Sequence, residues 1–248
     1  MFKERQVIVN DLAIKYLDEG TGQSLLLVHG WRDKKETFDS LTKHLSKNYR
    51  CICVDLPNFG ASQDSENTVT IEQYAKFLQA FISKLELNDY IVLGHSMGGQ
   101  IAIYGTGTKI VSPNALVLVA SAGVRSNARI AKQVLKFTSK IIRNFVPNKL
   151  KNKLYKKVGS DYSTQLSPVH KKIIANVLQH DVQQIASQIT VPALLVYGQK
   201  DVHTPISMGQ ALHRSMPTSK LVVLPDQDHW LHQSAASDIA VKIRKFLK

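Results

Sequence analysis

One serine of this chain stands in a pattern that can expose a nucleophile. An apolar run at residues 90–93 is followed by G-x-S-x-G at residues 94–98. This pattern is typical of a sharp turn between a buried strand and a helix, which raises the serine hydroxyl above the edge of a sheet. The neighbours must be small because the turn is strained. Ser96 is therefore a candidate nucleophile, and the backbone N–H of Met97 is a candidate donor to a developing oxyanion.

A serine hydroxyl is a weak nucleophile at neutral pH, so it needs a base, and the base needs a carboxylate to orient it. Both groups are expected after the ends of later strands, in the order serine, acid, histidine. Asp201 follows the apolar run 193–197, and His229 follows the run 221–224. The order and placement predict a catalytic triad of Ser96, Asp201 and His229.

Other roles for these residues stay open. Ser96 could be a packing serine in a tight turn. His203 and His232 are alternative bases, although either could be a simple surface histidine. Asp201 could cap a helix that begins near residue 205, but Thr204 suits that position better.

Two further polar residues are interpreted as structural. His95 lies inside the turn itself, directly before the serine. Asp55 follows the apolar run 51–54 and is interpreted as a loop anchor.

The expected strands and helices that must position the triad alternate along the chain. Strands joined at Asn10-Asp11 are expected first, and the later apolar runs are separated by segments with helical spacing. Continuous apolar runs indicate strands covered on both faces, and hence a mainly parallel sheet in an α/β protein. The expected strands cover 7–9, 14–17, 25–28, 51–54, 90–93, 116–119, 193–197 and 221–224, and the helices 36–45, 71–85, 98–105, 206–216 and 236–247.

Composition limits the class of protein. The 248 residues, 44% of them hydrophobic, suit one α/β domain. No apolar stretch approaches the roughly 20 residues that span a bilayer, and the first residues do not resemble a signal peptide. A cytoplasmic protein is expected. Cys51 and Cys53 are interpreted as small buried hydrophobes rather than a disulfide.

Positive charge is concentrated in one segment. Residues 123–190 hold 13 Lys and Arg against two acids, a net +11, whereas the remaining chain holds 19 against 17, a net +2. A basic amphipathic helix is predicted over 129–145, with Phe137 and Ile141 on its apolar face. We therefore expect a core domain of residues 1–122 and 191–248 and an inserted basic helical cap, or lid, of residues 123–190.

Four motifs together resemble the α/β-hydrolase superfamily, in its cap-bearing branch of esterases and carbon–carbon hydrolases. They lie at residues 27–31, 55–62, 94–99 and 197–201, and the last is followed by Asp228-His229. The resemblance implies a mostly parallel eight-stranded sheet flanked by helices, with a helical cap insertion. The family usually has glycine where this chain has Asn58 and Asp228. Asn58 could alter a turn, and Asp228 could hold His229 differently or raise its pKa.

The resemblance also implies an oxyanion hole and a substrate pocket. The backbone N–H of Trp31 would complete the oxyanion hole with that of Met97. Flanking residues suggest a pocket for an apolar acyl group, with Arg32 as a polar contact at its entrance. The predicted substrate-binding residues are His29, Gly30, Arg32, Phe137, Ile141 and Trp230.

The expected activity is that of a carboxylesterase-like serine hydrolase, which cleaves esters of small or medium apolar acyl groups through an acyl-serine intermediate. A carbon–carbon bond hydrolase of diketone-like ring-fission products, or a slow-turnover binding protein of the same fold, are the alternatives. Aspartate at position 96 would have indicated a dehalogenase or epoxide hydrolase.

No metal or organic cofactor is expected, because the sequence shows no metal-ligand spacing such as paired CxxC or HxxxH. The basic cap has two interpretations. Its charges could only keep amphipathic helices soluble, or they could meet an anionic membrane surface or an acidic carrier protein. Nucleic acid is not expected because stacking aromatics are not interleaved with the basic residues.

Overall fold

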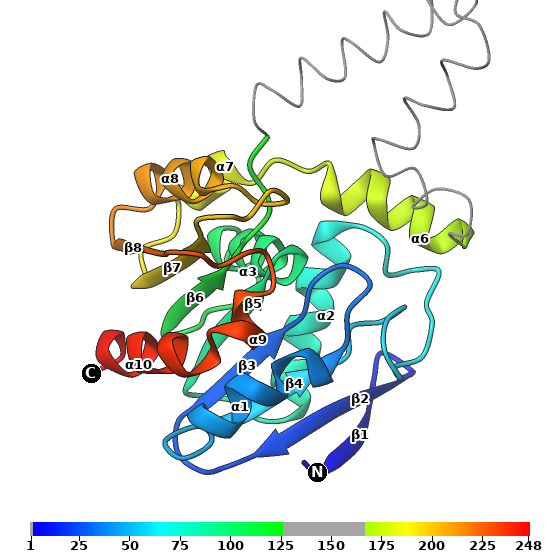
Figure 1. Ribbon diagram of the computed structural model, residues 1–248. Helices are drawn as coiled ribbons and strands as arrows, with labels where there is room; N and C mark the ends of the chain where they lie inside the picture. The colour runs from blue at the N-terminus through cyan, green and yellow to red at the C-terminus, as the bar shows by residue number, and fades with distance from the viewer. Residues whose placement is uncertain (1, 126–166) are drawn as a thin grey trace, which may run out of the picture.

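The computed structural model describes residues 2–125 and 167–248, which build one twisted sheet between layers of helices (Figure 1). Within this part of the chain the sheet has eight strands in the order β1-β2-β4-β3-β5-β6-β7-β8. The pairs from β4 to β8 are parallel, whereas β1 pairs antiparallel with β2 and β2 antiparallel with β4. The strands are β1 (Glu4–Val9), β2 (Leu12–Glu19), β3 (Ser24–Val28), β4 (Arg50–Val54), β5 (Tyr90–His95), β6 (Ala115–Val119), β7 (Ala193–Gly198) and β8 (Ser219–Leu224).

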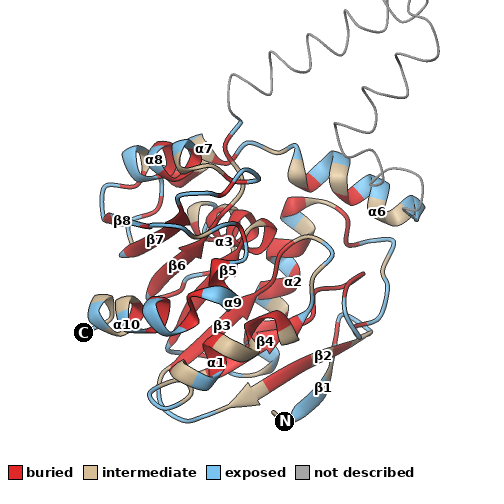
Figure 2. Ribbon diagram, viewed as in Figure 1, coloured by how far each residue is buried: buried red, intermediate tan, exposed pale blue. Residues whose placement is uncertain are grey.

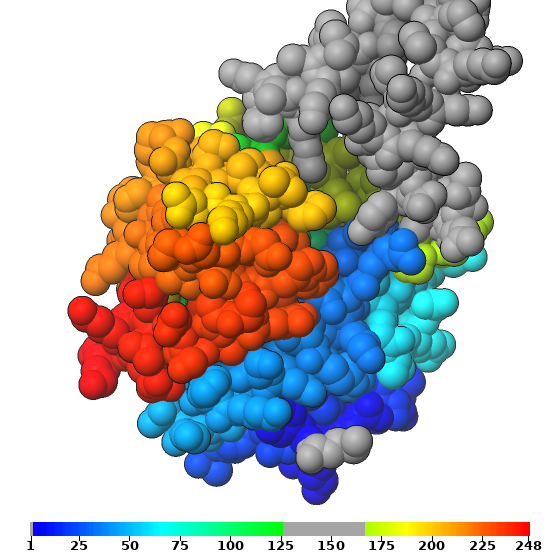
Figure 3. Space-filling model, in the orientation of Figure 1, coloured from blue at the N-terminus to red at the C-terminus, as the bar shows by residue number. Residues whose placement is uncertain are grey.

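Helices cover both faces of the sheet. One hydrophobic cluster joins α2, α3 and α8 to one face, and a second joins α1, α9 and α10 to the other. Figure 2 shows the buried strands between these layers. In Figure 3 the N-terminal part of the chain (blue) packs directly against the C-terminal part (orange and red). The described helices are the 3₁₀ turn η1 (Lys35–Phe38), α1 (Asp39–Leu45), α2 (Ile71–Lys84), α3 (Met97–Gly107), α6 (Pro168–Ile173), the π-helical turn η3 (Ile174–Leu178), α7 (Gln183–Ala186), α8 (Ile206–Ser215), α9 (Leu231–Ser234) and α10 (Ala236–Phe246).

The sequence explains these elements locally. Asn10 and Asp11 have positive φ angles of 49° and 63°, which suits the two-residue hairpin between β1 and β2. Thr70 and Gln73 form a capping box that begins α2. The central strands β3, β5, β6 and β7 are buried at every position, because helices lie on both sides. The predicted fold class is confirmed.

The strands β6 and β7 are neighbours in the sheet, and the segment predicted as a cap connects them. Its described end packs onto α3, where the Gln100 side chain donates hydrogen bonds to the carbonyl oxygens of Val177 and His180, both at 2.7 Å. Five buried apolar residues of its part 167–190 belong to the same hydrophobic cluster as one face of the sheet. They are Ile173, Val177, Val182, Ala186 and Ile189.

The other part of the predicted cap lies outside the described residues. The basic helix predicted over 129–145, with Phe137 and Ile141, belongs to this part.

Both cysteines are buried and unbridged, as expected. Burial raises the pKa of the Cys51 thiol to about 12, which keeps it protonated. Among the helices of residues 2–125 and 167–248, none combines the length and apolar character needed to cross a bilayer.

Candidate active site

The serine of the G-x-S-x-G pattern sits on a strained turn between β5 and α3. Ser96 has φ 52° and ψ −114°, a backbone region that non-glycine residues rarely adopt. Gly98 permits the turn because a β-carbon there would collide with the carbonyl oxygens of Val28 and His29. The serine is partly exposed at the end of β5, although its neighbours are buried. The chain thus presents the Ser96 hydroxyl at the carboxyl edge of the sheet.

The three predicted catalytic side chains come together from three strand ends. The Ser96 hydroxyl lies 3.1 Å from Nε2 of His229, and Nδ1 of His229 lies 2.8 Å from Oδ2 of Asp201. A proton on Nδ1 donates to the carboxylate, which leaves Nε2 free to accept the serine proton. This is the hydrogen-bond relay that nucleophilic catalysis by serine requires.

The acid of this relay is clamped by its own loop. Oδ1 of Asp201 accepts the backbone N–H groups of His203 at 2.8 Å and Thr204 at 2.9 Å. The Thr204 hydroxyl donates to Oδ2 at 2.7 Å. Burial of Asp201 opposes ionisation, but the hydrogen bonds from His229 and Thr204 hold the pKa of the carboxyl below its usual value. The carboxylate is therefore charged at neutral pH.

The prediction that Thr204 caps the following helix was wrong. α8 begins after Pro205, and no side chain caps it. The Thr204 hydroxyl faces inward instead, 2.7 Å from Oδ2 of Asp201 and 3.0 Å from the carbonyl oxygen of Ala120. Sequence reasoning missed this partner of the acid, because helix-capping preference does not show which way a hydroxyl faces.

The loop after β3 lies beside the nucleophile. A β-carbon on Gly30 would come within 3.2 Å of Cβ of Ser96, so the loop approaches the turn at its glycine. Trp31 follows in the same loop, and Met97 begins α3 directly after the serine. The predicted oxyanion-hole donors, the N–H groups of Trp31 and Met97, thus belong to the two backbone segments that meet at Ser96.

Comparison with known proteins places this arrangement in a family. A family model described as "Alpha/beta hydrolase family" matches residues 25–242. The chain belongs to the alpha/beta hydrolase family.

Individual relatives agree with this placement. The uncharacterised hydrolase YugF of Bacillus subtilis is 26% identical over 248 residues, covering 91% of this chain and 90% of its own length. A pimeloyl-acyl-carrier-protein methyl ester esterase of Neisseria meningitidis is 27% identical, covering 91% and 94%. An esterase from Exiguobacterium antarcticum has a similar structure, with a TM-score of 0.76 at 19% identity over 98% of this chain and 99% of its own. This last likeness concerns the fold alone.

The predicted pocket residues of this alpha/beta hydrolase lie in different environments. The Trp230 ring is 44% exposed and packs edge-on against His229, with ring centroids 5.6 Å apart. Arg32 is exposed on the loop after β3 and has a positive φ of 55°. Phe137 and Ile141 lie outside the described residues. Trp31, which is partly buried, packs edge-on against His170 of α6 at 5.5 Å.

The His29 side chain does not face a substrate, contrary to the prediction. It is fully buried, its Nε2 accepts the N–H of Leu56 at 3.0 Å, and its Nδ1–H donates to the carbonyl oxygen of Gly30 at 2.8 Å. Burial lowers the pKa of His29, so the ring is neutral. His29 holds the loop that carries Gly30 and Trp31.

The two residues that depart from the usual family glycines have local roles. Asn58 adopts φ 73°, which asparagine tolerates, and its side-chain amide bonds the backbone of Ser65 and Thr68. Asp228 is exposed and accepts the N–H of Trp230 at 2.9 Å. Both residues fix loops beside the site.

The structure also shows where three other histidines lie: His95, interpreted as structural, and the alternative bases His203 and His232. His95 is buried, and its Nε2–H donates to the carbonyl oxygen of His229 at 3.0 Å. His232 is not a surface histidine, because it is fully buried behind the triad. His203 is exposed and lies beside His229 with ring centroids 5.1 Å apart. Neither alternative base is hydrogen-bonded to Ser96 in the described structure.

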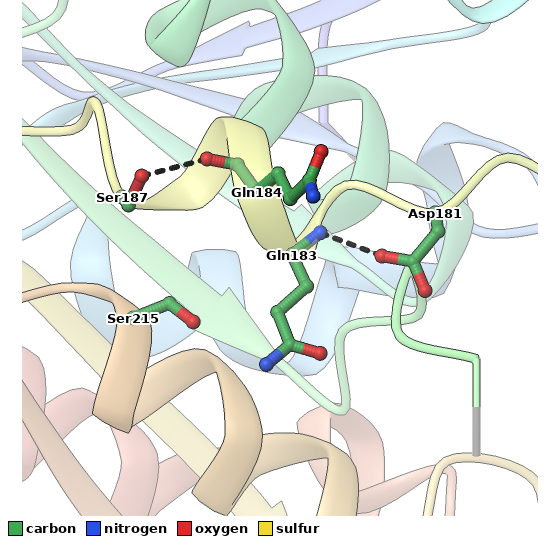
Figure 4. Close-up of a pocket in the computed structure, with 5 residues that line it drawn as sticks. All are labelled: Asp181, Gln183, Gln184, Ser187 and Ser215. Atoms are coloured by element: carbon green, nitrogen blue, oxygen red, sulfur yellow. Dashed lines mark hydrogen bonds between the residues drawn. The ribbon is translucent and has the colours of Figure 1, made fainter. Parts of the chain in front are cut away.

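A separate hollow lies between α7 and the end of α8 (Figure 4). Its volume is about 630 Å³, and polar side chains line it. The lining residues are Asp181, Gln183, Gln184, Ser187 and Ser215. None of these five belongs to the triad, so the hollow is distinct from the candidate active site.

Proposed function

We propose that this chain is a serine esterase that hydrolyses carboxylic esters of small or medium apolar acyl groups. The observation that carries the proposal is the relay from Ser96 through His229 to Asp201, with heavy-atom distances of 3.1 Å and 2.8 Å. Those distances fit proton transfer from the serine to the histidine. The strained turn of Ser96 supports a catalytic rather than a packing role for the hydroxyl.

In the proposed reaction, Ser96 Oγ attacks the ester carbonyl carbon while His229 Nε2 takes the hydroxyl proton. The N–H groups of Trp31 and Met97 stabilise the tetrahedral oxyanion. The alkoxide leaves with the proton from His229, and an acyl-Ser96 ester remains. Water, deprotonated by His229, then attacks the acyl group and releases the acid and free Ser96.

The apolar preference rests on the side chains around the relay. Trp230 lies beside His229 and exposes 44% of its surface, and Trp31 packs on Phe59 at 5.4 Å near the nucleophile turn. Aromatic surfaces favour apolar acyl groups over charged ones. The esterase name of the Neisseria relative supports ester chemistry.

Hydrolysis of p-nitrophenyl acetate and butyrate tests the proposal. Wild type should hydrolyse both, Ser96→Ala should lose turnover by about 10⁴-fold or more, and a fluorophosphonate should label Ser96. Ser207→Ala removes an exposed serine of α8 and is the matched control, which should keep the wild-type rate. Absence of both turnover and labelling would contradict the esterase proposal and favour a binding protein. Faster cleavage of a ring-fission diketone than of esters would favour the carbon–carbon hydrolase.

We further propose that the basic segment 123–190 binds an acidic partner, which brings the ester to the candidate active site. Its net charge of +11 supports this, and the carrier-protein name of the Neisseria relative favours an acyl-carrier protein over an anionic lipid surface. Hydrolysis of a carrier-bound ester should then fall steeply with added salt, whereas hydrolysis of the free methyl ester should not. Equal salt dependence of the two substrates would contradict an electrostatic partner, and salt-sensitive binding to anionic but not neutral vesicles would favour the lipid surface.

A further inference from the structure

Three side chains from three separate segments of the chain lie close together beside the candidate active site. Asp33 follows Trp31 by two residues, His95 directly precedes Ser96, and His232 follows the base by three residues. One carboxylate oxygen and one ring nitrogen from each histidine lie within 4.8 Å of one another. The cluster thus joins the loop after β3, the end of β5 directly before the nucleophile, and α9 directly after the loop of His229.

Each of these side chains has one polar atom without a partner. Oδ2 of Asp33, Nδ1 of His95 and Nδ1 of His232 are all buried and accept or donate no hydrogen bond within the described residues. His95 and His232 are 1% and 0% exposed. A buried polar atom left unpaired costs about 1–3 kcal/mol. Each member of the cluster therefore has a buried polar atom that a shared ligand could satisfy.

The other polar atom of each side chain is held by the protein. His95 donates its Nε2–H to the carbonyl oxygen of His229 at 3.0 Å, and Nε2 of His232 lies 2.8 Å from the Thr37 hydroxyl. Oδ1 of Asp33 accepts the N–H of Lys34 at 2.9 Å. Histidines that bind metals are held in this way, with the second ring nitrogen bonded to a backbone carbonyl or another fixed group.

We propose that Asp33, His95 and His232 bind one divalent transition-metal ion, with zinc as the best fit. Two imidazole nitrogens and one carboxylate oxygen are a common zinc donor set. Bonds of about 2.0–2.2 Å place the ligand atoms of a tetrahedral ion roughly 3.4 Å apart. Binding would therefore draw the ligand atoms together from up to 4.8 Å and separate the stacked rings of His95 and His232, whose centroids are 3.9 Å apart.

The ion would fix the relative positions of the three segments rather than take part in the reaction. It would bind Nδ1 of His95, the ring nitrogen that is not bonded to the carbonyl of His229. The ligands come from the loop after β3, the end of β5 and α9, so local spacing in the sequence gives no metal signature.

Titration calorimetry with Zn²⁺ on the chelator-treated full-length protein tests this site. Wild type should bind one equivalent, and Asp33→Asn and His232→Gln should each bind at least about tenfold more weakly. His203→Gln removes an exposed histidine beside the triad and should bind zinc as wild type does. No substrate is present, so the outcome is independent of the esterase proposal.

Two further measurements separate a coordinated ion from a buried water. Co²⁺ should give the visible absorption of a four-coordinate ion in wild type and not in Asp33→Asn. Zn²⁺ should also raise the melting temperature of wild type and leave that of Asp33→Asn unchanged. Asp33 is only partly buried, so its variant serves if His232→Gln does not fold. Wild-type zinc binding no tighter than that of Asp33→Asn would overturn the proposal and leave a bridging water.

Discussion

Two buried aspartates, Asp55 and Asp201, follow parallel strands of the same sheet, but their side chains have different roles. Asp55 follows β4, and Asp201 follows β7. Oδ2 of Asp55 lies 2.9 Å from the ammonium of Lys35, whereas Oδ2 of Asp201 lies 2.8 Å from a ring nitrogen of His229. The two carboxylates thus have similar positions and burial, but they bond to different side chains.

The partner decides the role of each carboxylate. Burial opposes the charge on Lys35, but its bonds to Glu36, Asp55 and Glu4 raise its pKa above the usual value, so it keeps its protons. The pair is permanent and anchors the loop after β4, as the sequence analysis expected for Asp55. His229 has a second ring nitrogen that faces Ser96, so a proton can enter and leave the relay. A strand-end carboxylate is therefore suited to the proposed catalysis only when its partner can exchange a proton with a nucleophile.

Replacing each aspartate by asparagine should give the largest difference in kcat between the two positions. Asp201→Asn should lower kcat for p-nitrophenyl butyrate by about 10⁴-fold, because the amide favours the wrong tautomer of His229. Asp55→Asn should keep kcat per folded molecule near the wild-type value. Steady-state kinetics, corrected for the folded fraction by circular dichroism, compare the two. Similar kcat losses in both variants would contradict the division of roles.

Removing the lysine partner should cost stability rather than catalysis. Lys35→Met leaves Asp55 as a buried unpaired charge, which should lower the free energy of unfolding by about 3–5 kcal/mol. Lys200→Met is the matched control, because the Lys200–Asp226 pair is exposed and should contribute less than about 1 kcal/mol. Urea unfolding measures both variants. Equal losses of stability would mean that the Lys35 pair is no more important than a surface pair.

Removing the Thr204 hydroxyl, which donates to the Asp201 carboxylate, should have a moderate effect on stability and kcat. Thr204→Val keeps the side-chain shape but loses the donor to Oδ2 of Asp201, which should cost about 1–3 kcal/mol of stability. A kcat loss of about tenfold is expected, since one hydrogen bond of about 1.4 kcal/mol corresponds to that factor. Thr204→Ser restores the hydroxyl and should recover most of the rate. Failure of serine to rescue would indicate a packing effect.

The smallest effect concerns pH. The pKa of Asp201 is lowered in the native state, so the carboxylate stabilises the fold above its unfolded pKa of about 3.9, and this stabilisation is lost as pH falls through the native value. The stability difference between wild type and Asp201→Asn should therefore shrink as pH falls from 6 toward 3. Urea unfolding at several pH values measures it. A difference that does not change with pH would contradict the lowered pKa.

The sequence predicted the sheet, and it named three side chains that meet in the structure, because both depend on local patterns. Continuous apolar runs mark buried parallel strands, and the motif around Ser96 marks the turn after one of them. Asp201 and His229 could then be found by their places after later strands, because parallel strands end at one edge of a sheet.

Contacts between distant loops were not predictable in this way. The inward-facing hydroxyl of Thr204 and the burial of His232 depend on how the loops pack. The helix-capping preference of Thr204 was outweighed by its two acceptors, the Asp201 carboxylate and the Ala120 carbonyl.

The sequence by itself determined which residues could do chemistry and in which order the strands bring them to one edge. Only the tertiary structure decided which partner each carboxylate meets, and it brought Asp33, His95 and His232 to one buried place. The physical reason is that strand patterns are set by neighbours along the chain, whereas hydrogen-bond partners across loops are set by packing between residues as far apart as 33 and 232.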